Sequence, residues 1–111
     1  MNEHQIAYLD ALRSGDYDQT TGSPKSLGSY CCLGVAAELT GCLVDVPHGS
    51  RLIKTEYGTS AEQLPDWLND LLDLTYADNQ EMVNMNDSYP ADFNDIANAL
   101  ENLWKTGSWE Y

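Results

Sequence analysis

The segment 30–39 constrains the fold more than any other part of the sequence, because it is apolar on nearly every side of a helix. Its apolar residues are Tyr30, Cys32, Leu33, Val35, Ala36, Ala37 and Leu39. A helix that is apolar all round is normally central and buried, so the rest of the chain must pack around it. We expect this helix to end at Thr40 and Gly41. Gly34 inside it costs about 1 kcal/mol relative to alanine, which indicates close packing against a neighbouring part of the chain.

The length and composition fit a single domain, residues 1–111. A chain of 111 residues, 42% of them hydrophobic, can bury one modest core, which argues against disorder. The longest apolar run, Cys31 to Ala37, is far shorter than the roughly 20 residues that a membrane-spanning helix needs. Residues 1–10 lack the basic and apolar regions of a secretory signal peptide. We therefore expect a cytoplasmic protein that does not interact with a membrane.

Two further helices are predicted from the spacing of apolar residues. Residues 3–13 carry apolar side chains at helical spacing, and the pattern stops at Ser14 and Gly15. Ser60 and Gln63 resemble a capping box, a pair whose side chains satisfy the first backbone N–H groups of a helix. Three leucines that follow them share one face, which predicts a helix over residues 61–74.

The clearest amphipathic pattern lies near the C-terminus, where apolar residues occur at i, i+3, i+4, i+7, i+10 and i+11. They are Phe93, Ile96, Ala97, Leu100, Leu103 and Trp104. Ser88 is a candidate cap for this helix, and Asp92 and Asp95 complement the positive end of its dipole. Gly107 is expected to end it.

One β-hairpin is predicted. Residues 43–46 and 51–57 are short and rich in β-branched side chains, and the turn residues 47–50 separate them. Residues 82–85 fit either a short strand or one helical turn. The sequence thus predicts an α+β fold that is mainly helical, with about four helices and one small β-hairpin.

The charged residues are strongly unbalanced and segregated. Eighteen Asp and Glu stand against five Lys and Arg, and the net charge of −13 argues against direct binding to nucleic acid or to an anionic membrane. No basic residue occurs between Lys54 and Lys105. On the predicted helix 61–74, four carboxylates at i, i+4, i+8 and i+11 are expected to form a row on one face. They belong to Glu62, Asp66, Asp70 and Asp73.

This acidic face has two interpretations. It is either a solvated surface that keeps a small protein soluble, or it occupies the basic groove of a nucleic-acid-binding protein by mimicking phosphates. Under the second interpretation, exposed aromatic residues strengthen the interface. The candidate binding residues are Glu62, Asp66, Asp70, Asp73, Asp92, Asp95, Tyr76 and Tyr89. The partner is then a protein with a basic surface.

The cysteines offer an alternative function. Two adjacent thiols at the N-terminus of the buried helix lie where partial positive charge lowers a thiol pKa. A histidine as base, an asparagine as orienting group and a glutamine as oxyanion donor complete a candidate catalytic set. The set is Cys31, Cys32, His48, Asn86 and Gln19, with Asp87 as an alternative to Asn86. Their order resembles that of papain-like cysteine hydrolases, which implies a small thiol hydrolase or transferase.

Two simpler roles compete for the same thiols. Free cysteines commonly pack as small hydrophobic residues in a buried helix, and the odd number of cysteines argues against a disulfide framework. Cys42 and His48 extend the pair to four possible zinc ligands, but the sequence lacks a Cys-x-x-Cys spacing. We therefore predict free thiols, with no metal and no cofactor.

Several blocks together resemble a group of small, mostly uncharacterised acidic proteins encoded by bacteriophages and prophages. The blocks are residues 11–19 (ALRSGDYDQ), 30–35 (YCCLGV), 64–65 (LP), 85–87 (MND) and 93–97 (FNDIA). The resemblance implies a viral accessory protein in the cytoplasm of a bacterial host. It also implies that the protein binds and inhibits or modulates a host factor, such as a defence nuclease. A structural or self-assembling phage component is a further alternative.

Overall fold

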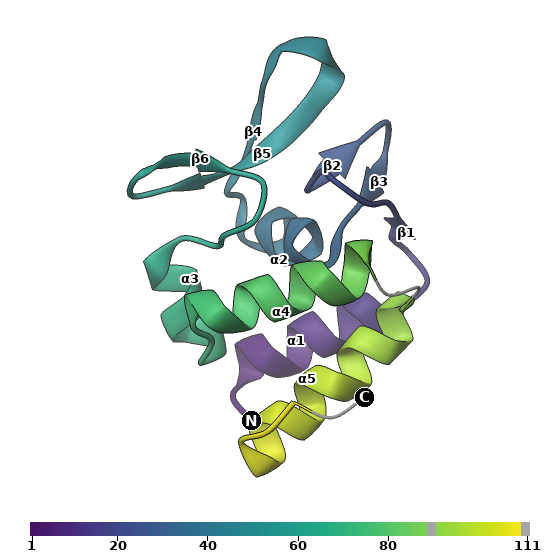
Figure 1. Ribbon diagram of the computed structural model, residues 1–111, viewed down its shortest axis with the longest axis vertical. Helices are drawn as coiled ribbons and strands as arrows, with labels where there is room; N and C mark the ends of the chain where they lie inside the picture. The colour runs from purple at the N-terminus through teal and green to yellow at the C-terminus, as the bar shows by residue number, and fades with distance from the viewer. Residues whose placement is uncertain (89–90, 110–111) are drawn as a thin grey trace.

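The computed structural model describes residues 1–88 and 91–109 (Figure 1). Within them the chain forms an α+β fold, as predicted, but with five helices rather than about four and with more than one hairpin. The helices are α1 (Glu3–Arg13), α2 (Cys32–Thr40), α3 (Asp66–Leu72), α4 (Tyr76–Asp87) and α5 (Phe93–Thr106). The strands are β1 (Asp18–Gln19), β2 (Lys25–Ser26), β3 (Ser29–Tyr30), β4 (Leu43–Asp45), β5 (Ser50–Thr55) and β6 (Gly58–Ser60). A 3-10 turn, η1 (Pro47–Gly49), joins β4 to β5.

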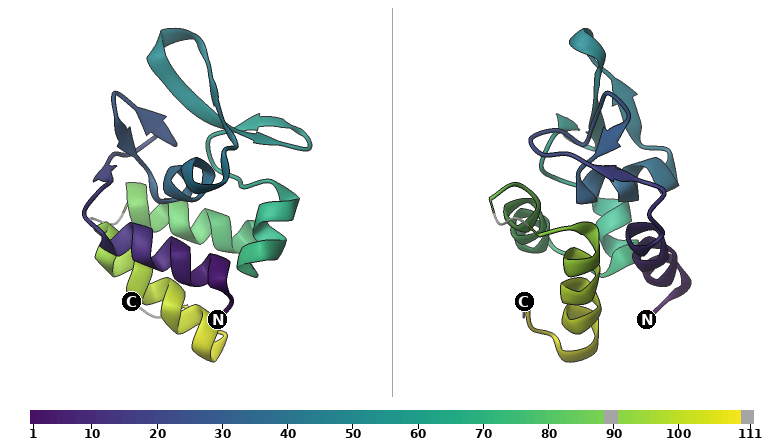
Figure 2. Two further views of the ribbon diagram at one scale, coloured as in Figure 1. Left: turned by 180° about the vertical axis from the view of Figure 1, so that it is seen from behind. Right: turned by 90° about the vertical axis from the view of Figure 1, so that its right-hand side faces the viewer.

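Helix α2 lies at the centre of the fold, between the strands and the other helices (Figure 2). It contacts α1 and α4 on one side and β3, β4 and β5 on the other. Every residue from Cys32 to Ala37 is buried, which confirms the prediction of a central helix. The helix ends at Gly41 in a left-handed conformation, also as predicted. None of the helices in the described residues is long and apolar enough to cross a membrane.

Only glycine fits at position 34, because the backbone of the loop before β2 lies in close contact with it. A Cβ atom at Gly34 would lie 1.7 Å from the carbonyl oxygen of Pro24. The backbone N–H of Cys31 donates to that same oxygen at 3.1 Å. The prediction that Gly34 marks close packing is therefore confirmed, and its neighbour is a backbone carbonyl.

Strand β5 organises the sheet. It pairs antiparallel with β4 along one edge, and with β2 and then β6 along the other. Ile53, which pairs with both Leu43 and Ser60, is fully buried. The β4–β5 hairpin confirms the sequence prediction, whereas β1, β2, β3 and β6 were not predicted. With two or three residues each, these strands are too short to show the alternation by which strands are recognised.

Helix α4 was not predicted as a helix. Its buried residues are Asn79, Met82, Met85 and Asn86. Since two of the four are asparagines, the apolar periodicity of the segment is weak. The Asn79 side chain is satisfied in the core, because Oδ1 accepts from Leu64 N at 2.8 Å and Nδ2 donates to Asn69 Oδ1 at 2.9 Å.

The helix predicted over residues 61–74 is shorter, because α3 begins only at Asp66 and ends at Leu72. Ser60 Oγ accepts from the backbone N–H groups of Glu62 and Gln63, each at 3.1 Å. These hydrogen bonds form a turn that precedes the helix and do not cap it. The first residue of α3 follows Pro65, which has an extended conformation.

Helix α5 confirms the clearest sequence pattern, but its cap is different. Asp92, and not Ser88, is the N-cap residue. Its side chain accepts from Asp95 N at 2.8 Å, and the Asp95 side chain accepts from Asp92 N at 3.2 Å. Gly107 ends the helix, as predicted.

Candidate functional site

The predicted row of carboxylates on one helical face does not form. Only Asp66 and Asp70 lie on α3, whereas Glu62 precedes the helix and Asp73 ends it in a left-handed conformation (φ 53°). Glu62, Asp70 and Asp73 are nevertheless exposed. Among the described residues, these three side chains have no hydrogen-bond or ion-pair partner. They remain available to another molecule.

Other carboxylates of the acidic region have structural roles. Asp92 and Asp95, both predicted to bind a partner, cap α5 by accepting from each other's backbone N–H. Asp78 accepts from Trp109 Nε1 at 3.0 Å. Glu101 accepts from two basic side chains, which lower the pKa of its carboxyl group. The acidic region is thus divided between carboxylates that support the fold and carboxylates that do not.

Asp66 joins two exposed tyrosines from different elements. The hydroxyl of Tyr57, in the turn between β5 and β6, donates to Asp66 Oδ2 at 3.0 Å. The hydroxyl of Tyr76, the first residue of α4, donates to Asp66 Oδ1. This hydrogen bond raises the pKa of Tyr76 above its usual range, with smaller contributions from burial and from the charge of Asp66. We call Tyr57, Asp66 and Tyr76 the tyrosine–aspartate cluster.

Two open clefts flank this cluster. The larger, about 480 Å³, lies between the β5–β6 hairpin and the start of α4, and we call it the hairpin cleft. Among the residues that line it are Thr55, Tyr57, Ser60, Gln63, Leu64 and Tyr76. The smaller cleft, about 340 Å³, is lined by Asp66, Asp70 and Tyr76 among others. Tyr76 therefore separates two clefts, each of a size typical for ligand sites, which is about 300–1,000 Å³.

Sequence analysis identified Tyr76 and Asp66 but missed Tyr57. In the sequence, Tyr57 ends a predicted strand, where an aromatic residue is ordinary. Its position directly before Gly58 marks a turn, and turn residues are commonly exposed. In the structure Tyr57 is 79% exposed.

Most of the candidate catalytic set meets in one hydrogen-bond network. Asn86 Oδ1 accepts from Gln19 Nε2 at 3.0 Å and from Cys32 N at 3.2 Å. Asn86 Nδ2 donates to Thr20 O at 2.8 Å and to Asp87 Oδ1 at 2.9 Å. The network joins β1, the start of α2 and the end of α4. Its polar groups satisfy one another, as in a structural network.

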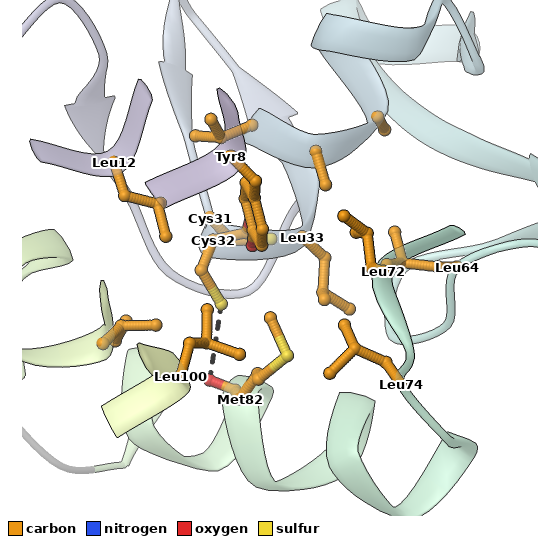
Figure 3. Packing of buried hydrophobic residues seen from close by; sticks show 14 of the residues in the cluster. Tyr8, Leu12, Cys31, Cys32, Leu33, Leu64, Leu72, Leu74, Met82 and Leu100 are labelled. Carbon is orange, nitrogen blue, oxygen red and sulfur yellow. Dashed lines mark hydrogen bonds between the residues drawn. The ribbon is translucent and has the colours of Figure 1, made fainter. Parts of the chain in front are cut away.

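The two thiols of the set are buried and protonated. Cys32 is fully buried, and its thiol points to the backbone oxygen of Met82 at 3.5 Å (Figure 3). Cys31 Sγ caps α2 by accepting from Gly34 N at 3.4 Å. Burial raises the pKa of Cys31 to about 11, and the negative charge of Asp87 adds to the increase. The prediction of a lowered pKa at the helix N-terminus is therefore wrong, because desolvation outweighs the helix dipole.

The other residues of the candidate catalytic and zinc-binding sets do not complete a site in the described structure. The side chain of His48 and the whole of Tyr89 lie outside the described residues. The backbone of His48 is in η1, at the tip of a hairpin that projects away from the helices (Figure 1). Cys31, Cys32 and Cys42 are free thiols. Within the described part of the chain, no group of three or more His, Cys, Asp or Glu side chains is arranged to hold a metal ion.

In a comparison with known protein families, residues 1–104 match one family, described as "Domain of unknown function (DUF8296)". No curated protein and no solved structure matches the chain.

Proposed function

Because the chain belongs to the family of domains of unknown function DUF8296, we propose a function from its own surface. The protein is a non-enzymatic acidic interaction module that binds a basic surface of another protein and thereby inhibits or modulates that partner. Its resemblance to bacteriophage proteins makes a host protein in the bacterial cytoplasm the proposed partner. The observation that carries the proposal is the group of unpaired, exposed carboxylates of Glu62, Asp70 and Asp73, on and beside α3, which we call the α3 surface.

The charge balance around α3 supports this proposal. Four of the five basic residues are paired with carboxylates elsewhere in the described structure. The pairs are Arg13–Glu101, Lys25–Glu38, Arg51–Asp45 and Lys105–Glu101. The fifth, Lys54 on β5, forms no ion pair with Glu62, Asp70 or Asp73 in the described structure. These carboxylates therefore keep a negative potential that attracts a basic surface and speeds association.

Exposed aromatic and apolar residues accompany these charges. On α3, Trp67 is 44% exposed and Leu71 is 36% exposed. Tyr76 is 46% exposed at the start of the next helix. Aromatic side chains supply much of the binding energy in protein interfaces. Since the regular helical row is absent, the proposal depends on charge and aromatic contact rather than on the spacing of phosphates.

Charge reversal tests the proposal. A Glu62→Lys, Asp70→Lys, Asp73→Lys variant and the wild type are each used to capture proteins from a bacterial lysate, with elution by increasing salt. Asp66 is left unchanged because its carboxylate joins two tyrosines. We expect the wild type to retain a partner that salt elutes, and the variant to lose it.

The matched control carries the same change of charge on another surface. Asp10, Asp16 and Asp18 are exposed, and their side chains have no partner in the described structure. The Asp10→Lys, Asp16→Lys, Asp18→Lys variant should retain the partner. Retention by the α3 variant, or equal loss by both variants, contradicts a specific role of the α3 surface.

A further inference from the structure

The residues that line the hairpin cleft are uncharged, and carboxylates lie next to it. Its lining residues, all within the described structure, include no Lys or Arg. The Asp66 carboxylate lies at its rim, hydrogen-bonded to two tyrosines that line the cleft. The carboxylate of Glu56 adjoins it and accepts from Asp66 N at 2.9 Å. A cationic group between the two tyrosines would therefore lie near the Asp66 carboxylate.

The tyrosine rings are held in place before any ligand arrives. Each hydroxyl is fixed by its hydrogen bond to Asp66, although Tyr57 is 79% exposed and Tyr76 is 46% exposed. Ring faces attract cations, and the attraction is stronger where water is partly excluded. Aromatic side chains fixed in this way lose little conformational entropy on binding.

Gln63, one of the residues that line the cleft, has a hydrogen-bond acceptor without a partner among the described residues. This atom, Oε1, is buried. An unpaired acceptor is unfavourable. The terminal torsion of a glutamine is broad, so a donor in the cleft would stabilise an amide turned toward it.

We propose that the hairpin cleft binds an arginine side chain of the protein partner, an inference that rests on the proposed function and specifies its chemistry. A guanidinium group is planar and stacks on aromatic rings. It also carries five N–H donors that pair with a carboxylate and an amide oxygen together. The ammonium group of lysine is compact and strongly hydrated, and it lacks the planar face with which a guanidinium group stacks on a ring. The cleft therefore selects arginine over lysine.

Titration of the isotope-labelled protein with short peptides, followed by NMR, tests this proposal. Three peptides that differ at one central position carry arginine, lysine or citrulline, the last being the neutral analogue of arginine. The arginine peptide should shift the signals of Thr55, Ser60 and Gln63. The lysine peptide should bind about tenfold more weakly, and the citrulline peptide should not bind measurably.

Two variants with matched controls locate the site. Tyr57→Leu removes an exposed ring and should weaken arginine binding at least about fivefold, whereas Ile6→Ala, which shortens an exposed apolar side chain on α1, should not. Gln63→Met should weaken it about tenfold, whereas Gln80→Met on the exposed surface of α4 should not. Signals far from the cleft report whether each variant is folded.

The outcomes separate this inference from the proposed function. Equal binding of arginine and lysine peptides, or full binding by both Tyr57→Leu and Gln63→Met, overturns the arginine site. The proposed function survives that result if the α3 charge-reversal variant still loses its partner. Arginine binding at the cleft, with unchanged capture by the charge-reversal variant, supports the site and contradicts the proposed function.

Discussion

Gln19 Nε2 donates a hydrogen bond to Asn86 Oδ1 at 3.0 Å, across 67 positions of the sequence. Asn86 also accepts from the backbone of Cys32. Residues from three distant segments of the sequence therefore meet at one buried amide. If these residues have a structural role, replacing Asn86 should destabilise the fold. If they have a catalytic role, the fold should stay intact.

Replacement of Asn86 by alanine should destabilise the protein by about 3 kcal/mol. The change removes four hydrogen bonds and leaves buried donors and acceptors without partners. Urea unfolding of Asn86→Ala measures the loss. Asn84→Ala, at an exposed position of the same helix, should change the free energy of unfolding by less than about 0.5 kcal/mol. Similar values for the two variants would contradict a structural role.

Replacement of Gly34 by alanine should cost at least about 3 kcal/mol or prevent folding. The added Cβ would overlap the backbone oxygen of Pro24, and a backbone group in a packed loop cannot move away cheaply. Thermal unfolding measures the effect. Ala77→Gly, on the exposed surface of α4, calibrates the ordinary difference between glycine and alanine at about 1 kcal/mol. A Gly34→Ala variant as stable as the wild type would contradict the contact.

The thiols should be unreactive in the folded protein. The pKa of Cys31 is raised from 9.0 to about 11 by burial, so the reaction with iodoacetamide should be slow at pH 7 and should accelerate on unfolding. A thiol that reacts fast near pH 6 would restore the hydrolase alternative. The Cys31 thiol ionises at a lower pH in the unfolded chain than in the folded chain. Its contribution to the free energy of unfolding should therefore be fully present below pH 9 and should be lost between pH 9 and about 11.

Leu27→Asn should stabilise the protein by about 1 kcal/mol. Leu27 is 95% exposed and has φ 52° at the tip of the β2–β3 hairpin, where Gly28 also has positive φ. Asparagine tolerates this conformation better than leucine and favours two-residue hairpin turns. Urea unfolding tests the change. Leu27→Val, with a β-branched side chain, should destabilise, and the opposite order would contradict the turn geometry.

The accuracy of the sequence analysis depended on which side chains were buried. Helix α2 was predicted because its buried residues are apolar, and α5 because its stripe is regular. Buried amides caused the main errors, since Asn79 and Asn86 concealed the periodicity of α4. In α1, Gln5 is buried because its amide donates to Leu72 O at 3.0 Å, whereas Ile6 is 46% exposed. Such hydrogen bonds join distant parts of the chain, and local spacing does not reveal them.

The candidate site was predictable only in part for the same reason. The excess of negative charge follows from the sequence alone, and Tyr76 and Asp66 were among the candidate binding residues. The cluster requires Tyr57 and Tyr76 to converge on Asp66, from a hairpin turn and from the start of a helix. That convergence depends on the packing of β6, α3 and α4. Of these three elements, β6 and α4 were not predicted, and α3 was predicted to be longer than it is.

The salt dependence of partner binding tests the central claim most directly. The affinity of the captured partner is measured by calorimetry between low and high salt, for the wild type and for the Glu62→Lys, Asp70→Lys, Asp73→Lys variant. Exposed charges are screened over about 8 Å at physiological ionic strength, so wild-type affinity should fall steeply with salt. The variant should bind weakly at every salt concentration. A wild-type affinity that does not change with salt, or an equal affinity of the variant, would contradict the claim that these carboxylates bind a basic surface.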